Sequence, residues 1–448
     1  MDILAEAQDI KNLLKDRQWW QIKKVLSKLK APDIVDIWES LSERNILILF
    51  RLLDKEKAAN VFTELGPERQ EILLRQMSNS QIKKIILEIP PDDRTELFEE
   101  LPGRVVQKLI NILPSDERKE ALELLGYPDE SVGRIMTPDY VAIKPDWNVK
   151  KALEHIREFG KDAETIDVIY VVDEQWKLLD SITLKEIILA EPDTKIRELM
   201  DENYFSVNVY EDQEIAAKVI QRYDLIALPV TDNDGTLLGI VTIDDILDVL
   251  EEEVTEDFQK VAAVSPFDIS YTSASAWDLY SKRIIWLSIL LVAGFLSSTV
   301  MAHFENTLSA IISLSFFIPV LIDSGGNVAT QSATLIIRAI SVGDLTVKKW
   351  FNVVKKELII GSMIGITLSA LLFLRVLILN EGILMGFTLS ISIFITIIVA
   401  NLMGAILPII LTKLKFDPAV VSSPLITTII DTLGLIIYFS IANLVFKL

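Results

Sequence analysis

The sequence predicts a multi-domain chain: an all-α superhelical N-terminal domain, a tandem of α/β modules, and an α-helical transmembrane domain with five spans. Apolar residues recur every twelve positions through the first 125 residues, short apolar strands alternate with helices over 133–253, and five apolar stretches follow residue 283. About 20 apolar residues suffice to cross the hydrocarbon core of a bilayer. We place the domains at 1–130, 131–195, 196–253, 254–281 and 282–448, the fourth being a connecting helix.

Charge divides the chain into an acidic half and a membrane half. Residues 1–257 hold 55 of the 64 acidic and 32 of the 44 basic side chains, whereas the remaining 191 residues hold 9 and 12. This acidic excess argues against nucleic-acid binding and suits either a cationic partner or plain solubility. The first residues lack the basic and apolar pattern of a secretory signal, so we expect the acidic half to lie in the cytosol.

The N-terminal repeat predicts short helices that stack into a superhelix. Most of its apolar positions are followed by Pro, Gly, Ser or Asp, which are typical of helix starts. One unit is therefore a helix of about eight or nine residues plus a turn, and such helices bury an apolar face only by stacking. The repeated positions are Leu29, Leu41, Leu53, Leu65, Met77, Ile89, Leu101, Leu113 and Leu125.

One repeat turn places two carboxylates, Asp92 and Asp93, at the start of a helix. Helix capping explains at least one of them. A cation site is the alternative.

The middle of the chain predicts two matching α/β modules. The expected strands include residues 168–172, 226–230 and 238–242, and helices begin at Leu184 and Ile243. The segment Ser181-Ile-Thr183 in the first module parallels Ile240-Val-Thr242 in the second. This tandem resembles a pair of CBS domains, a regulatory module that often binds adenine nucleotides in the cleft between its halves.

The CBS resemblance implies a nucleotide site in the second copy. That copy retains Gly239-x-x-Thr242-x-x-Asp245, in which Thr242 and Asp245 would meet the ribose and phosphates of a regulatory ligand such as ATP. The first copy departs from this pattern with Asp180 and Glu186 in place of the glycine and the aspartate. A purely structural or metal-sensing module is the alternative for both copies.

An acidic helix follows the second module. At helical spacing, one face carries Asp244, Asp248 and Glu251, and basic residues are absent from 224 to 259. Like charges on one face repel unless cations lie between them. A solvated acidic face and a divalent-cation site both remain open.

The five apolar stretches predict a multi-pass protein of the cytoplasmic membrane, in contact with lipid. They cover residues 284–301, 308–340, 358–379, 383–411 and 419–446. Basic residues at 282–283, 348–356 and 413–415 mark the cytoplasmic ends. With the N-terminal domains in the cytosol, five spans place the C-terminus outside.

The second span contains Pro319 and the pair Gly325 and Gly326, which we expect to interrupt the helix. Carbonyl groups freed in a membrane are tolerated only against protein or a water-filled cavity. Asn327 and Gln331 share one face of this segment, so it is expected to line a pathway. A polar contact between helices is the alternative.

Asp431 is a carboxylate in the middle of the last span. A charge at this depth costs roughly 3 kcal/mol or more, so it normally faces a partner, a cavity or an ion path. Asp431 is therefore either held by a neighbouring helix for structure alone or binds an ion.

Two long motifs resemble the MgtE family of magnesium channels, and the resemblance covers the whole chain. They are Gly325-Gly-Asn327-x-x-x-Gln331-Ser332-Ala-Thr and Asp417-Pro-Ala…Ser423-Pro-Leu…Thr427-Thr428-x-x-Asp431-x-x-Gly434. The resemblance implies a homodimer with its pore on the two-fold axis, in which Asp431 of each subunit receives hydrated Mg²⁺. One or two carboxylates acting through retained waters suit this ion, and a two-fold axis supplies the second carboxylate. The other expected pathway residues are Asn327, Gly325, Gly326, Gln331, Thr428 and Asp323.

The resemblance also implies a gate. At high intracellular Mg²⁺, ions bridge carboxylates of the N-domain, the CBS pair and the connecting helix, and the pore closes. At low Mg²⁺, like charges repel and the pore opens. The expected sensing residues are Asp92, Asp93, Asp212, Glu214, Asp232, Asp245, Asp248, Glu253, Asp257 and Asp417.

Two other functions remain open from the sequence. An ion-coupled secondary transporter of divalent cations also has broken helices and a buried carboxylate. A pore-less, nucleotide-sensing membrane regulator would use Asp431 only for structure. An enzyme is not expected, because the sequence has no P-loop, no zinc-binding His-Glu-x-x-His and no nucleophile elbow.

Overall fold

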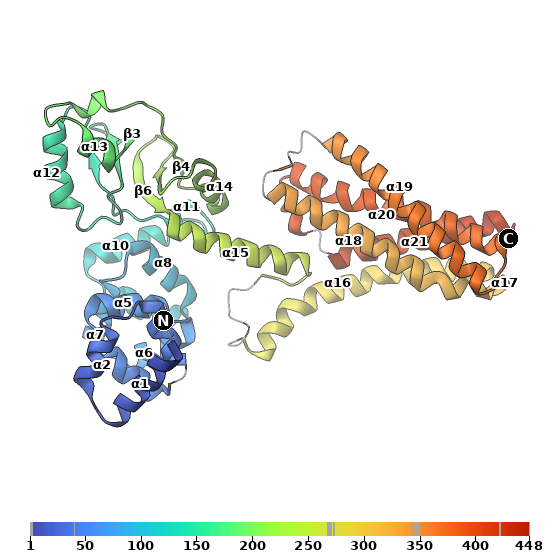
Figure 1. Ribbon diagram of the computed structural model, residues 1–448, viewed down its shortest axis with the longest axis horizontal. Helices are drawn as coiled ribbons and strands as arrows, with labels where there is room; N and C mark the ends of the chain where they lie inside the picture. The colour runs from blue at the N-terminus through green and yellow to red at the C-terminus, as the bar shows by residue number, and fades with distance from the viewer. Residues whose placement is uncertain are drawn as a thin grey trace. The chain divides into compact units, whose positions relative to one another are not determined.

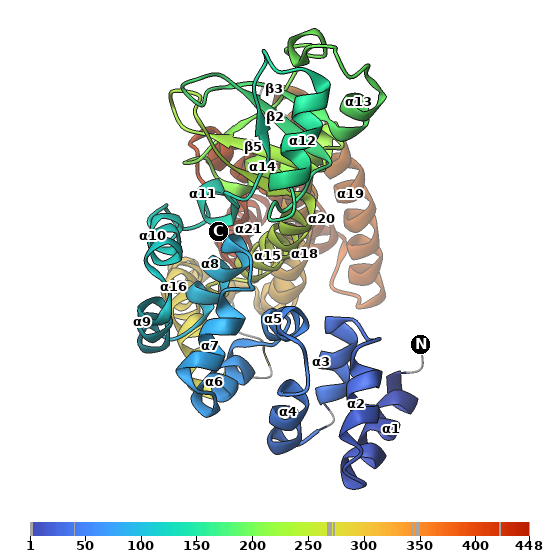
Figure 2. The same ribbon diagram turned by 90° about the vertical axis from the view of Figure 1, so that its left-hand side faces the viewer.

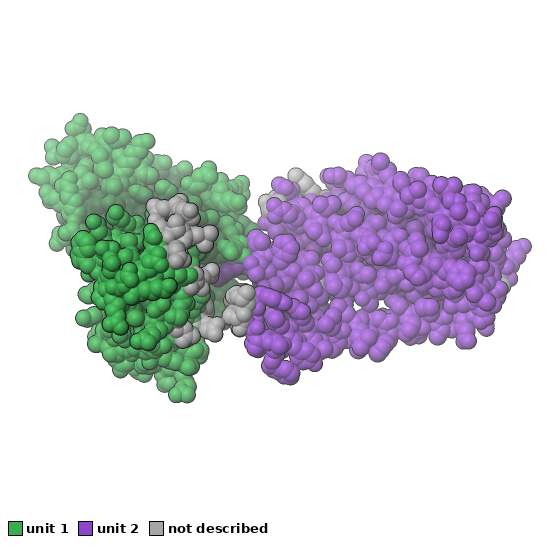
Figure 3. Space-filling model, turned by 60° about the horizontal axis from the view of Figure 1, so that its bottom comes forward, with its two compact units in different colours: residues 1–251 green, residues 252–448 purple. Residues whose placement is uncertain are grey.

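The computed structural model describes residues 3–39, 41–266, 271, 274–341, 344–345, 350–420 and 423–447. The chain forms two units, residues 1–251 and 252–448, which Figure 3 colours separately. The first unit contains the repeat helices and the α/β modules, and the second contains the long apolar helices.

Short helices built on the twelve-residue repeat form the N-terminal part of the first unit (Figure 2). Their starts follow the sequence signals: Pro67 and Pro91 open two of them, and the Asp54 side chain caps another by accepting from the Lys57 N–H at 2.9 Å. Leu65, Ile89 and other repeat positions are buried in one shared core, so the predicted stacking is confirmed. The helices are α1 (Ile3–Lys15), α2 (Trp19–Leu26), α3 (Ala31–Glu39), α4 (Glu43–Phe50), α5 (Lys55–Thr63), α6 (Pro67–Gln76), α7 (Asn79–Ile86), α8 (Pro91–Glu100), α9 (Gly103–Ile112) and α10 (Ser115–Leu124).

Two small sheets of the same topology follow. In each sheet the first strand pairs parallel with the second, and the second pairs antiparallel with the third. The first module contains α11 (Val132–Ile135), β1 (Ala142–Ile143), α12 (Val149–Phe159), β2 (Val168–Val172), β3 (Leu178–Thr183), α13 (Leu184–Leu189) and the 3₁₀ turn η1 (Ile196–Glu198). The second contains β4 (Val207–Asn208), α14 (Gln213–Tyr223), β5 (Ala227–Thr231), β6 (Leu237–Thr242) and the start of α15 (Ile243–Val261). The predicted α/β tandem is confirmed.

The two modules are joined by backbone pairing. Isolated bridges connect Thr137 with Ile240 and Lys177 with Thr236. A small apolar core that includes Tyr170 and Ile240 draws on strands of both sheets. The modules therefore form one body inside the first unit.

The expected connecting helix over 254–281 is not a single helix, and this expectation was wrong. Helix α15 begins inside the second module and ends at Val261, and the next helix begins at Ala276. The left-handed backbone of Ala263 (φ 57°) explains the stop, because a left-handed residue just past the last turn closes a helix. Residues 267–270 and 272–273 lie outside the described part of the chain.

In the part of the second unit that the structure describes, five helical segments are long and apolar enough to cross a membrane, as predicted. In Figure 1, α18, α20 and α21 run side by side, with α19 along α20 and α16 along α21. The elements of this unit are α16 (Ala276–His303), α17 (Glu305–Ala310), the 3₁₀ turn η2 (Ile312–Phe317), α18 (Ile318–Ser341), α19 (Trp350–Ile378), α20 (Ile383–Lys413), the 3₁₀ turn η4 (Pro418–Val420) and α21 (Ser423–Phe446).

The break expected at Pro319 and the glycine pair does not occur, so that prediction was wrong. Helix α18 is continuous from Ile318 to Ser341. Proline is tolerated in the first turn of a helix, where its missing N–H has no partner to lose. The irregular part lies earlier, where α17 gives way to η2 at Ile311.

Candidate functional site

Asp431 lies on α21 within the bundle of the second unit. Its Oδ1 atom is buried and has no hydrogen-bond partner among the residues that the structure describes. Asp323, on α18, is close enough to repel it electrostatically. A buried carboxylate oxygen without a partner normally carries a substantial desolvation penalty. No hydrogen bond from the described residues therefore compensates this oxygen.

Helix α18 carries an exposed polar stripe formed by Asp323, Asn327 and Gln331, which follow one another at intervals of four residues. Asn327 Nδ2 donates to Asp323 Oδ2 at 3.2 Å. Polar side chains in a membrane helix face protein or water rather than lipid. The polar stripe therefore needs a covering that the described part of a single chain does not supply.

Gly325 and Gly326 bring α18 into close contact with α21. A Cβ added at Gly325 would lie 2.9 Å from Ile430 Cγ2, and one at Gly326 would lie 2.7 Å from Thr427 Cγ2. Both distances are too short for a real side chain. The glycines thus allow the helix that bears the polar stripe to approach the helix that bears Asp431. Their expected role in lining the route with backbone groups stays a prediction.

Thr428 is turned toward its own helix. Its hydroxyl donates to the Pro424 carbonyl at 2.9 Å, as threonines in membrane helices commonly do. One turn later, the hydroxyls of Thr432 and Ser297 lie 2.8 Å apart and join α21 to α16. The role of Thr428 in the pathway stays a prediction.

In the first unit, Asp92 and Asp93 at the start of α8 face the acidic first turns of α15. Figures 1 and 2 place these two helices side by side. Asp92 is buried, and its Oδ1 atom has no hydrogen-bond partner in the described residues. Burial, followed by the charges of Asp245 and Asp93, raises the pKa of Asp92 well above its usual range.

The neighbouring carboxylates titrate abnormally for the same reasons. Burial and then the charges of Asp244 and Asp248 raise the pKa of Asp93 to about 6. Burial also raises the pKa of Asp245 to about 6, although hydrogen bonds from Thr242 oppose the rise. Several negative charges are therefore held together at neutral pH against their mutual repulsion.

Asp92, Asp93, Asp244, Asp245 and Asp248 form an acidic cluster. Two further carboxylates, Glu64 and Glu164, belong to it and were not predicted. Burial and Asp248 raise the pKa of Glu64, and burial followed by Asp244 and Asp93 raises the pKa of Glu164. No local pattern in the sequence marks either of them. Among the described residues, no three His, Asp or Glu side chains converge tightly enough to hold a metal ion directly.

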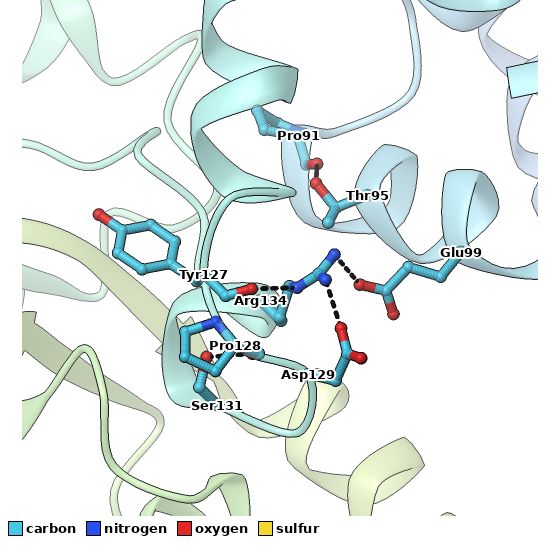
Figure 4. Close-up of polar contacts among 8 residues, drawn as sticks. All are labelled: Pro91, Thr95, Glu99, Tyr127, Pro128, Asp129, Ser131 and Arg134. Carbon is cyan, nitrogen blue, oxygen red and sulfur yellow. Dashed lines mark hydrogen bonds and ion pairs between the residues drawn. The ribbon is translucent and has the colours of Figure 1, made fainter. Parts of the chain in front are cut away.

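Arg134 clamps the far end of α8 to the α/β modules. Figure 4 shows its guanidinium between Glu99 of α8 and Asp129, while its Nε donates to the Tyr127 carbonyl at 2.8 Å. The other end of α8 carries Asp92 and Asp93. One end of the helix is therefore held by ion pairs, and the other faces the repulsive cluster.

Three predicted sensing residues lie apart from this cluster and have local roles. Asp212 caps α14 by accepting from the Glu214 N–H at 2.9 Å, and Glu214 forms an ion pair with Lys218. Asp232 accepts from the Thr236 N–H at 2.8 Å in a turn, and this backbone contact lowers its pKa. The structure does not bring these residues together with Asp92.

The other predicted sensing residues belong to the second unit. Glu253 and Asp257 lie on the last turns of α15. Asp417 accepts from Lys260 Nζ at 2.7 Å, and the same ammonium lies 2.8 Å from Glu256. Burial lowers the pKa of Lys260, but its hydrogen bonds with Asp417 and Glu256 outweigh burial and leave it above the ordinary value. A sensing role for Asp417 stays a prediction.

The nucleotide motif serves as a helix cap. Asp245 Oδ2 accepts from the Thr242 N–H at 3.0 Å and from its hydroxyl at 2.6 Å. Thr183 and Glu186 make the same capping box in the first module. Asp180, which replaces the expected glycine, is buried and accepts backbone N–H groups, including that of Asp201 at 2.9 Å. A nucleotide site at Thr242 stays a prediction.

Comparison with known proteins agrees with this organisation. The MgtE divalent cation transporter family matches residues 318–441, the MgtE intracellular N domain matches 29–130, and the CBS domain matches 132–193 and 196–252. The magnesium transporter MgtE of Thermus thermophilus is 38% identical over 444 residues, which cover 98% of each chain.

The chain belongs to the MgtE family. A second MgtE, the magnesium transporter of Bacillus subtilis, is 37% identical over 320 residues, which cover 71% of this chain and 70% of that protein. A crystal structure of the cytosolic domain of the Mg²⁺ channel MgtE in complex with ATP superposes with a TM-score of 0.52 and 33% identity. It covers 54% of this chain and 99% of that structure. This MgtE protein is thus an integral membrane protein whose full-length relatives are transporters.

Proposed function

We propose that this protein is an Mg²⁺ channel of the cytoplasmic membrane that takes up Mg²⁺ as a homodimer and is closed by intracellular Mg²⁺. The observation that carries the proposal is the buried Oδ1 of Asp431, which has no hydrogen-bond partner in the described part of the chain, together with the polar stripe of α18. Because the chain belongs to a family of divalent cation transporters, a divalent cation is the ion that this carboxylate would bind.

The pathway chemistry follows from the ion. Mg²⁺ gives up water reluctantly and is usually bound through retained waters by one or two carboxylates. A two-fold axis along the exposed stripe would cover Asp323, Asn327 and Gln331 and would set two copies of Asp431 opposite each other. Water around the ion would then hydrogen-bond to the amide and carboxylate oxygens of both stripes.

The gate uses the acidic cluster of the first unit. Asp92, Asp93, Asp245 and their neighbours repel one another in the compact arrangement. Hydrated Mg²⁺ between them would cancel that repulsion, which agrees with the lack of a tight direct ligand set among the described residues. Low Mg²⁺ would let α8 separate from α15 and would favour the open channel.

Orientation and nucleotide binding complete the proposal. The basic loop residues favour cytosolic N-terminal domains and an outer C-terminus. The relative's cytosolic domain binds ATP, and we extend that property to the cleft beside Thr242 and Asp245 as a regulatory site.

Influx into liposomes tests this function. With the purified protein and an enclosed Mg²⁺ indicator, we expect Mg²⁺ to enter down its own gradient with no proton or Na⁺ gradient present. Protein-free liposomes are the control. Influx that requires a second ion gradient would favour the coupled transporter instead.

A further inference from the structure

A second carboxylate of the membrane domain, Glu357 on α19, joins three helices. Asn401 of α20 donates its Nδ2 to Glu357 Oε2 at 2.7 Å and to the Glu357 carbonyl at 2.8 Å. Ser332 of α18 donates to the Asn401 carbonyl at 3.0 Å, and its hydroxyl lies 3.4 Å from Glu357 Oε2. One acidic side chain thus links α18, α19 and α20.

Glycines hold this junction at close range. A Cβ added at Gly404 would lie 2.3 Å from the Ala329 carbonyl oxygen, so α20 and α18 meet backbone to backbone. A Cβ added at Gly361 would lie 3.2 Å from Asn401 Cβ, on the contact between α19 and α20. Ser332 and Asn401 are both buried. Ser332 and Asn401 therefore sit in a tightly packed interface, and Glu357 is half-buried at its side.

The junction lies behind the polar stripe. Ser332 is buried, whereas its neighbour Gln331 and the other stripe residues, Asn327 and Asp323, are exposed. Glu357 consequently does not belong to the stripe. Whatever fixes Ser332 on the buried face also fixes the direction in which the exposed face points, because both are on one helix.

We propose that Glu357 is a positioning residue for the ion pathway, which sets the rotation and height of α18 through Asn401 and Ser332. This inference rests on the proposed function of the α18 stripe as a pathway wall. In every described contact the Glu357 side chain accepts a hydrogen bond. An acceptor oxygen is therefore what the junction requires, and the negative charge is dispensable. A glutamine keeps one acceptor oxygen, whereas an alanine keeps none.

Distances between spin labels, measured together with influx, test this role. The chain has no cysteine, so cysteines placed at the exposed positions Leu335 of α18 and Ile410 of α20 can be labelled selectively. Each labelled variant is mixed with an excess of the same variant without labels, so that one pair of labels is measured per dimer. Mg²⁺ influx is recorded in the same liposomes.

We expect Glu357→Ala to lower influx at least about tenfold, as loss of one buried hydrogen bond would, and to broaden the distance between the labels. Glu357→Gln retains both influx and the narrow distance. Ser332→Ala keeps the charge and the volume of the junction, and we expect it to show a smaller change of the same kind. It serves as the test variant if Glu357→Ala does not fold. Glu381→Ala, an acid in the loop after α19, is the matched control and changes neither reading.

Two results would overturn the proposal. In the first, Glu357→Gln is as inactive as Glu357→Ala while the label distance is unchanged, which would assign the role to the charge of Glu357. In the second, influx and label distance are unchanged in both Glu357→Ala and Ser332→Ala. If the unaltered chain carries no Mg²⁺, the proposed function fails. The label distance still decides whether Glu357 positions α18.

Discussion

Asp431→Asn is expected to reduce Mg²⁺ influx into liposomes at least about a hundredfold. The substitution removes the charge that faces the ion from both subunits of the proposed dimer. Loss of one partner of a desolvated charge pair costs roughly 3 kcal/mol, which corresponds to about a hundredfold. The side chain keeps its shape, so the packing of α21 against α18 is preserved.

The same variant is expected to be at least as stable as the unaltered protein. Asp431 Oδ1 is buried and finds no hydrogen-bond partner among the described residues, and a neutral amide avoids the penalty of an ionised group there. Loss of influx together with an unchanged or raised melting temperature would identify a functional charge. Glu381→Gln is the control and leaves influx unchanged. Normal influx in Asp431→Asn would remove Asp431 from the pathway.

Without Mg²⁺, the first unit is expected to loosen as the pH rises from 5 to 7.5. The pKa of Asp93 and that of Asp245 are raised to about 6 from 3.8. Their neutral forms therefore favour the compact arrangement below about pH 4, and that contribution is lost as the pH passes 6. For Asp93 the whole change, from below pH 4 to above pH 6, corresponds to about 3 kcal/mol, of which roughly half is lost above pH 5. Protease cleavage of the soluble half measures the change.

Mg²⁺ should reverse this loosening at pH 7.5, because a divalent cation replaces the protons. Asp93→Asn with Asp245→Asn should stay protected without Mg²⁺ and lose most of the pH dependence. Asp116→Asn, an exposed acid on α10, is the matched control. Equal cleavage at pH 5 and 7.5, with and without Mg²⁺, would contradict a gate built on the acidic cluster.

Periodic features of the sequence predicted the fold well. The twelve-residue repeat found the helices of the N-terminal domain, and the strands around Val172 and Thr242 fell within a residue of their observed ends. The wrong prediction about the second span concerns proline and glycine, which can either interrupt a helix or be accommodated within it. Pro319 lies in the first turn of α18, where it does no harm, and Gly325 serves close packing rather than a break.

The sequence alone predicted a residue of the candidate site only where that residue is unusual for its segment. Asp431 stands out because a mid-span charge is costly. Glu64, Glu164 and Glu357 were missed, because each is ordinary in its local sequence. Only long-range folding brings Glu164 to the acidic cluster and Glu357 to Asn401. Asp212 and Asp232 were expected from the resemblance to sense Mg²⁺. In the structure they serve as a helix cap and a turn residue, and their sensing role stays a prediction.

Current through a planar bilayer tests the central claim most directly. With Mg²⁺ as the only permeant cation, we expect discrete openings whose current reverses at the Mg²⁺ equilibrium potential and which cease when millimolar Mg²⁺ is added on the side of the acidic half. The absence of any such current, or openings that Mg²⁺ on that side does not close, would contradict a channel gated by intracellular Mg²⁺.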